Sequence, residues 1–272
     1  MFQWWTDRHC FGLAVLLYGV SLVQALFLWR QGFRRDSFIN YCILLLGFGF
    51  HTLAMGLRGF SFNRCPIHNL FEASMFIGWT MVAAYMLVGC WRPLQFLGAF
   101  VSPLVFSLGV FALMPPLDVP EAPTEIGWFS LHASLIFLSY GSLGLGAAAG
   151  MMFLTQEHDL KFHKFRALYS LLPPIQRLET LVSQLLLAGY VLLTAGLIVG
   201  AFWLKQKRGV WYVPDPKIHW SALIWLYIIA LLIWHWRYAL RGRKFAWAVV
   251  GGFIFIALTF WGFNIFSPLH HP

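Results

Sequence analysis

The residues of this chain best suited to chemistry are a set of histidines and one aromatic loop. Four histidines lie within or at the ends of long apolar segments: His51, His132, His235 and His270. The loop 209–220 holds aromatic rings, a carboxylate and an amine: Trp211, Tyr212, Asp215, Lys217 and Trp220. Two imidazoles can bind opposite faces of a haem iron, and Arg or Lys neutralises propionates. These residue types therefore suit a flat, amphipathic, metal-bearing ligand such as haem.

Each histidine also has a structural interpretation. His51 lies inside an apolar segment, where an ionisable residue indicates a functional site; the alternative is a neutral imidazole bonded to a neighbouring helix. His132 and His270 share a depth, so a ligand could lie between them, although interfacial histidines are common. His235 stands in the run Trp-His-Trp-Arg, whose Trp and Arg are ordinary membrane anchors. Arg58 and Glu72 flank a short loop and could form an ion pair.

The apolar segments must be the elements that position these side chains. Of the 272 residues, 60% are hydrophobic and 11% are charged, whereas soluble domains carry about 25% charged residues. Backbone groups in lipid must be satisfied internally, so apolar runs of about 20 residues are membrane-spanning helices. The predicted helices cover 11–29, 38–58, 69–90, 95–114, 129–154, 180–203, 219–237 and 245–266. The sequence thus predicts a single all-α polytopic membrane bundle of eight helices over residues 1–272.

The charge distribution predicts the orientation of this bundle. The net charge is +9, and the basic residues lie in short loops, which favours membrane topology over nucleic-acid binding as its explanation. The side richer in Lys and Arg is predicted to be cytoplasmic, with both termini and the loop 209–220 on the outer, periplasmic side of a bacterial inner membrane. The 4 cysteines form no Cys-x-x-Cys pair. A Cys10–Cys65 disulfide and four independent thiols remain alternatives.

Four stretches in order resemble the cytochrome c assembly superfamily, which includes the haem-handling CcsA, CcmC and CcmF proteins. The resemblance covers about residues 38–271 and is strongest to CcsA-like and HemX-like or YpjD-like members. The loop 209–220 shares residues with the tryptophan-rich signature of the family: Gly209, Asp215, Pro216, Lys217 and Trp220. The other stretches run from His51 through Arg58 to Glu72, from His132 to Tyr140, and from His235 to His270. Tyr212 and Pro214 replace two signature tryptophans.

The resemblance implies two histidine pairs that hold haem b without a covalent bond. His132 and His270 would be the outer pair beside the signature loop, and His51 and His235 would be an intramembrane pair that holds haem in transit. Trp211 and Asp215 would belong to the haem-binding loop. Lys217 or Arg58 would neutralise a propionate.

The expected function is therefore haem binding and handling in cytochrome c biogenesis, by an integral membrane protein that is not an enzyme by itself. Membrane lipid surrounds it, and a partner protein would supply thiol chemistry or dock apocytochrome c. One alternative is a HemX-like regulatory or structural membrane protein without haem. Another is a small-molecule permease, which predicts polar residues facing a pore on several helices; among these residues only His51 clearly qualifies.

Overall fold

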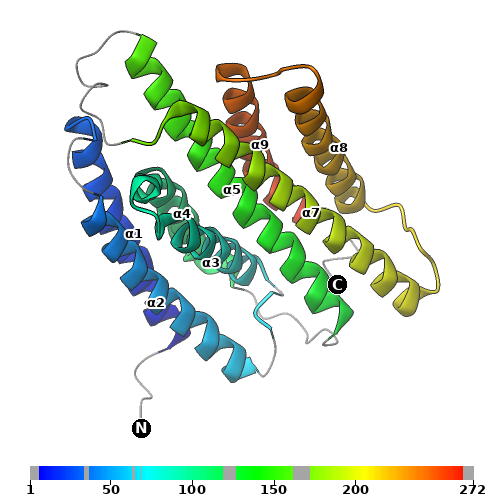
Figure 1. Cartoon of the computed structure of the whole chain (residues 1–272). Helices are drawn as coiled ribbons and strands as arrows, with labels where there is room; N and C mark the ends of the chain where they lie inside the picture. The colour runs from blue at the N-terminus through cyan, green and yellow to red at the C-terminus, as the bar shows by residue number, and fades with distance from the viewer. Residues whose placement is uncertain are drawn as a thin grey trace.

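The computed structural model describes residues 6–33, 37–62, 65–67, 69–118, 127–161 and 172–265. Its elements, in chain order, are α1 (Asp7–Arg30), α2 (Phe38–Phe62), α3 (Leu70–Gly89), η1 (Arg92–Leu97), α4 (Gly98–Ala112), η2 (Pro115–Leu117), α5 (Trp128–Lys161), α7 (Ile175–Arg208), α8 (Pro216–Arg237) and α9 (Arg243–Ile265) (Figure 1). Within the described ranges, 8 helices are long and apolar enough to cross a membrane, η1 and α4 counting as one span. The predicted all-helical bundle is confirmed.

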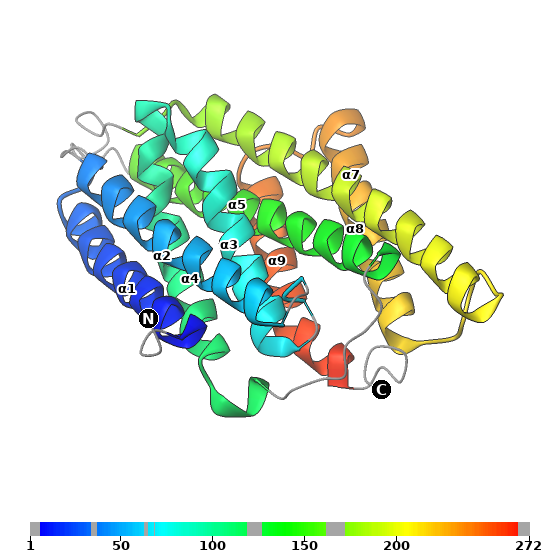
Figure 2. The same ribbon diagram turned by 90° about the horizontal axis from the view of Figure 1, so that it is seen from below.

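Helix α5 is the central element of the bundle. It packs against α3, α7 and α9, and Figure 2 shows it between the α1–α2 pair and the α7–α8 side. Small residues make this possible: a methyl group at Gly141 would collide with Thr80 of α3. Ser139 donates a hydrogen bond to the Gly189 carbonyl of α7 at 2.8 Å. Close backbone approach and interhelical hydrogen bonds are the usual means by which membrane helices associate.

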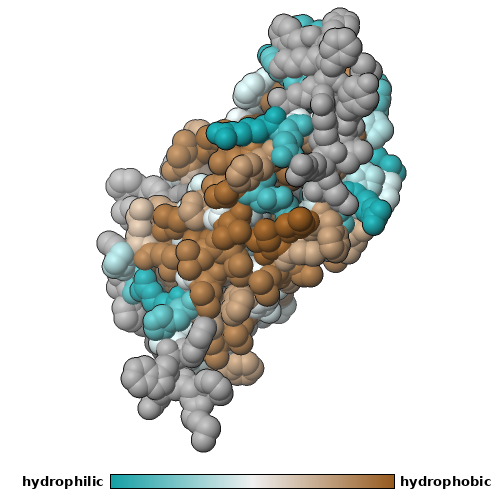
Figure 3. All heavy atoms as spheres, turned by 90° about the vertical axis from the view of Figure 1, so that its left-hand side faces the viewer, coloured by the Kyte–Doolittle hydropathy of each residue, from teal (hydrophilic) through white to brown (hydrophobic). Residues whose placement is uncertain are grey.

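The outer surface of α1 and α2 is apolar. Figure 3 shows hydrophobic residues in a broad band over this face, with hydrophilic residues towards its ends. The exposed residues include Leu16, Val20, Val23, Phe27, Leu45 and Leu46. A soluble protein rarely exposes so large an apolar area, whereas hydrocarbon solvates it well. The chain is a multi-pass membrane protein.

The two ends of the bundle carry different candidate residues. At the His132 end, α1, α3, α5 and α8 begin and α2, α4, α7 and α9 end; at the opposite, His235 end, the directions are reversed. That the His132 end faces the outer side of the membrane stays a prediction. All cysteines are free, so the interpretation as independent thiols is confirmed over a Cys10–Cys65 disulfide.

Candidate functional site

His132 lies in the second turn of α5 and faces α7. Its Nδ1 is 2.7 Å from the carbonyl oxygen of Gly196. A carbonyl only accepts, so Nδ1 carries the hydrogen and Nε2 is the basic nitrogen. The ring lies against Gly200, where a Cβ would come within 2.6 Å of Nδ1. This is the arrangement typical of a metal-binding histidine, in which one nitrogen is fixed by a carbonyl and the other can bind the metal.

The aromatic loop closes over this histidine, as the sequence predicted. A cavity of about 100 Å³ is lined by His132, by α7 residues between 197 and 204, and by Trp211, Tyr212 and Ile218. The side chains of Trp211 and Tyr212 are 55% and 56% exposed, so they form the outer wall of the cavity. The structure thus brings one predicted ligand and the predicted haem-binding loop together.

Helix-end signals give the loop its shape. Gly209 ends α7 with a left-handed φ of 74°, a conformation that glycine adopts without strain. Asp215 caps α8, accepting a hydrogen bond from the Lys217 amide at 2.8 Å, and Pro216 occupies the first helical position. The Asp-Pro-Lys core of the loop is therefore a helix start. Its Asp215 side chain is buried and holds the backbone of Lys217 in place.

Two cations lie close to the cavity. Lys217 lies in the first turn of α8, beside Ile218, which lines the cavity. The ammonium of Lys205 is 5.7 Å from the centre of the Trp211 ring and donates to the Gly209 carbonyl at 2.8 Å. A haem propionate requires positive charge, and aromatic faces suit the flat porphyrin. His270 lies outside the described residues, so the second member of the outer pair stays a prediction.

His51 is buried within the bundle between α1 and α3. Its Nδ1 is 3.0 Å from the Tyr18 hydroxyl, and its ring centroid is 5.0 Å from that of Phe11. Gly78 of α3 leaves room for the ring, and among the described residues the buried Nε2 has no hydrogen-bond partner. The hydrogen bond to Tyr18 fits the structural interpretation of His51. The Nε2 atom is the nitrogen that a ligand or metal could still contact.

His235 lies at the other end of the bundle. Its Nδ1 is 3.0 Å from the Leu240 carbonyl oxygen and 3.9 Å from Glu179 Oε1, and its ring stacks on Phe245. These contacts come from α7, from α9 and from the turn between α8 and α9, whereas the contacts of His51 come from α1 and α3. The structure does not bring the predicted intramembrane pair together. Ligation of one haem by both rings would require the helices to rearrange.

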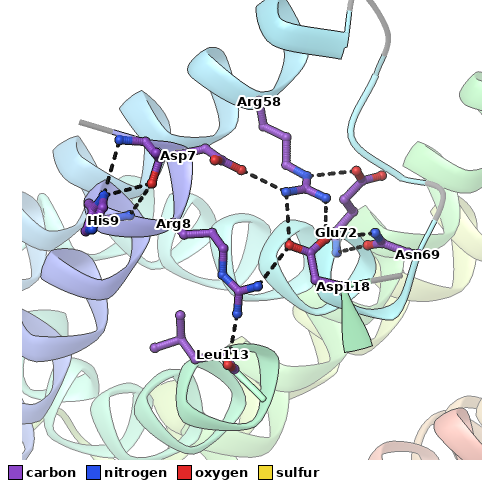
Figure 4. A network of polar contacts seen from close by, with 9 residues as sticks. Asp7, Arg8, His9, Arg58, Asn69, Glu72, Leu113 and Asp118 are labelled. Carbon is purple, nitrogen blue, oxygen red and sulfur yellow. Dashed lines mark hydrogen bonds and ion pairs between the residues drawn. The ribbon is translucent and has the colours of Figure 1, made fainter. Parts of the chain in front are cut away.

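Arg58 is the centre of an ion network that the sequence predicted only in part (Figure 4). The predicted pair with Glu72 is confirmed: Arg58 Nε is 2.8 Å from Glu72 Oε1. Arg58 Nη1 also contacts Asp7 at 2.8 Å, and Nη2 contacts Asp118. Arg58 thus has three carboxylate partners from three parts of the chain. The Nε, Nη1 and Nη2 atoms of Arg58 each contact a carboxylate of the protein.

The remaining members of the network join it from the helix ends. Arg8 bonds Asp118 at 3.1 Å and the Leu113 carbonyl at 3.1 Å. Asn69 donates to Asp118 at 3.1 Å and caps α3 through the Glu72 amide at 2.8 Å. The only local signal was Asn69, an N-cap residue three positions before a glutamate. The network fixes α1, α2 and α3 to the start of the segment that leads to His132.

Comparison with known proteins agrees with this architecture. The sequence profile described as cytochrome C assembly protein matches residues 67–271. The chain belongs to the cytochrome c assembly protein family. The finer placement in a HemX-like or YpjD-like branch stays a prediction.

Several relatives of this family member carry the name cytochrome c biogenesis protein CcsA. The protein of Guillardia theta is 26% identical over 255 residues, which cover 86% of this chain and 85% of the relative. That of Prochlorococcus marinus strain MIT 9215 is 26% identical, with coverage of 93% and 90%. That of Gloeothece citriformis strain PCC 7424 is 24% identical, with coverage of 95% and 92%. The similarity therefore extends over nearly the whole of both chains.

Proposed function

We propose that this protein acts in cytochrome c biogenesis by holding haem without a covalent bond at its His132 end. The observation that carries the proposal is the geometry of His132. The Gly196 carbonyl fixes Nδ1 at 2.7 Å, which leaves Nε2 as the nitrogen able to bind iron. No described residue hydrogen-bonds to Nε2, and an aromatic cavity adjoins the ring. The ammonium of Lys205 is 5.7 Å from the centre of the Trp211 ring in the cavity wall.

Each of these side chains would have a separate role in binding haem. His132 and His270 would hold the haem iron, as the family resemblance implies. Lys217 would neutralise a propionate, and Asp215 would keep Lys217 in place by capping α8. Bound haem would supply an iron and a reactive porphyrin edge to an apocytochrome c, whose thiols would form the covalent bonds. The protein itself would contribute binding, orientation and exclusion of water.

The size of the cavity adds one requirement. About 100 Å³ is below the 300–1,000 Å³ usual for a small-molecule site. Haem would enter only if the Trp211 and Tyr212 side chains moved outward. Both are more than half exposed. Their movement would separate the Trp211 ring from Phe202 and break the hydrogen bond between Tyr212 and His219. We place the His132 end on the periplasmic side of a bacterial inner membrane, where apocytochrome c would meet it.

The second candidate is a HemX-like regulatory or structural protein that carries no haem. One observation favours it. His219 Nδ1 faces the Asp215 carbonyl at 2.9 Å and therefore donates, so Nε2 accepts from the Tyr212 hydroxyl at 2.7 Å. Tyr212, which stands where the family signature has tryptophan, thus ties the loop to α8 and opposes its opening.

Absorption spectroscopy separates the two candidates. The protein is purified in detergent after expression with added haem precursor, and its spectrum is recorded oxidised and reduced. We expect a Soret band that His132→Ala greatly weakens and that exogenous imidazole partly restores. His158→Ala is the matched control, because His158 is exposed on the same helix at the other end. A colourless wild-type protein would refute haem binding and favour the second candidate.

A further inference from the structure

An apolar groove opens between α4 and α9, and it shares no lining residue with the His132 cavity. Its volume is about 280 Å³. The floor is formed by α3 and α5, and the walls by α4 and α9, which both pack on α5 but barely touch each other. Among the wall residues are Leu104, Leu108, Phe253 and Ala257. The groove therefore lies between two spans of the membrane bundle and is distinct from the His132 cavity.

The surroundings of the groove are hydrocarbon-facing. Val110 on α4 is exposed beside it, as are Ile254 and Leu258 on α9, with Leu258 75% exposed. The Ser107 hydroxyl in the wall is satisfied within its own helix, donating to the Pro103 carbonyl at 2.7 Å. An apolar cavity of this kind does not hold water. In a bilayer the molecule available to fill it is a lipid.

One polar group in the floor indicates which part of a lipid lies there. Tyr140 is 4% exposed and lines the groove, yet its hydroxyl forms no hydrogen bond with any described residue. Hydroxyls in apolar surroundings are normally paired, so a ligand in the groove can supply the acceptor for this one. Its ring contacts Trp220 in the second turn of α8 and Phe260 near the end of α9. The ring therefore lies on the His132 side of the middle of the bundle, the direction in which the nearer lipid ester groups lie.

We propose that this groove binds one acyl chain of a membrane glycerophospholipid, whose ester carbonyl accepts a hydrogen bond from Tyr140. The chain fills the space between α4 and α9 and joins two helices that the protein itself leaves apart. The lipid thus packs against α3, α4, α5 and α9 as part of the structure. The inference does not rest on haem binding.

The test uses native mass spectrometry of the full-length protein in detergent with two added phospholipids. The lipids share headgroup and chain length, but one has ester links and the other has ether links, which lack the carbonyl. We expect the wild-type protein to retain one lipid and to prefer the ester form by about fivefold, the usual effect of one hydrogen bond. Tyr140→Phe should retain lipid but lose the preference. An equal preference in both proteins would overturn the role of Tyr140.

A second pair of variants tests the groove itself. Ala257→Trp places an indole in the groove and should abolish lipid retention, whereas Leu258→Trp, on the exposed neighbouring position, should leave it unchanged. Equal retention by both variants would overturn the proposal. Loss of a Soret band rather than of lipid in Ala257→Trp would assign the groove to haem and also overturn it. If Ala257→Trp fails to fold, the ester preference and its loss in Tyr140→Phe decide the matter.

Discussion

Substitution of Gly200 by alanine tests whether the position of the His132 ring matters for haem binding. The new Cβ would lie within 2.6 Å of Nδ1 and 2.7 Å of Cε1, distances at which atoms must move. The ring cannot shift without weakening the 2.7 Å hydrogen bond from Nδ1 to the Gly196 carbonyl. The substitution therefore acts on the orientation of the ligand and removes no polar group.

The size of the effect follows from the bond that is lost. Removal of the partner that orients a metal-binding histidine costs about 10- to 100-fold in affinity, which corresponds to about 1.4–2.7 kcal/mol. Alanine favours helix over glycine by about 0.5–1 kcal/mol, which offsets part of the cost of moving the His132 ring. The stability of the protein should therefore change little. We therefore expect a folded protein with weakened haem binding.

The assay is a haem titration followed at the Soret band, beside thermal unfolding followed by circular dichroism. Gly251→Ala is the matched control, since Gly251 lies in α9 with no atom within 4 Å of the added Cβ. In a His132→Ala background, Gly200→Ala should have no further effect. Wild-type affinity in a folded Gly200→Ala protein would refute the assignment of His132 as an oriented ligand.

Three further predictions concern the ion network, the loop and the orientation. Arg58→Ala removes an ionic partner of the fully buried Glu72 and should lower the free energy of unfolding by about 3–5 kcal/mol. The Arg8 side chain is 38% exposed, so Arg8→Ala should lower it by about 1 kcal/mol or less. Thermal unfolding of both variants measures the difference. Asp215→Ala should cost about 1 kcal/mol through loss of the α8 cap and weaken haem binding, whereas Asp215→Asn should preserve both; equal unfolding of the two variants would contradict the capping role. In detergent, maleimide should label exposed Cys90 faster than Cys65, because burial raises the pKa of the Cys65 thiol and leaves less thiolate. In intact cells an impermeant maleimide should leave Cys90 unlabelled until lysis, and labelling before lysis would reverse the predicted orientation.

The amino-acid sequence was sufficient for the features that depend on local properties. Length and hydropathy of each apolar run identified the spans, because a helix in lipid satisfies its backbone by itself. The limits were less accurate: α7 runs Ile175–Arg208 against the predicted 180–203, since hydropathy marks only the membrane portion of a helix. The order of motifs identified the family. The start of α8 is marked locally, because Asp215 is a typical N-cap residue and Pro216 a typical first helical residue.

The contacts between helices were decided by the tertiary structure. In a soluble helix, polar residues on one face reveal the side that packs; in a membrane helix, lipid and neighbouring helices both accept apolar side chains. Nothing local therefore shows that His132 faces Gly196, 64 positions away, or that Arg58 meets Asp118, 60 positions away. For the same reason the sequence could not show that His51 and His235 have different neighbours. The sequence named the groups able to bind haem and the loop beside them, and the packing determined which of those groups come together.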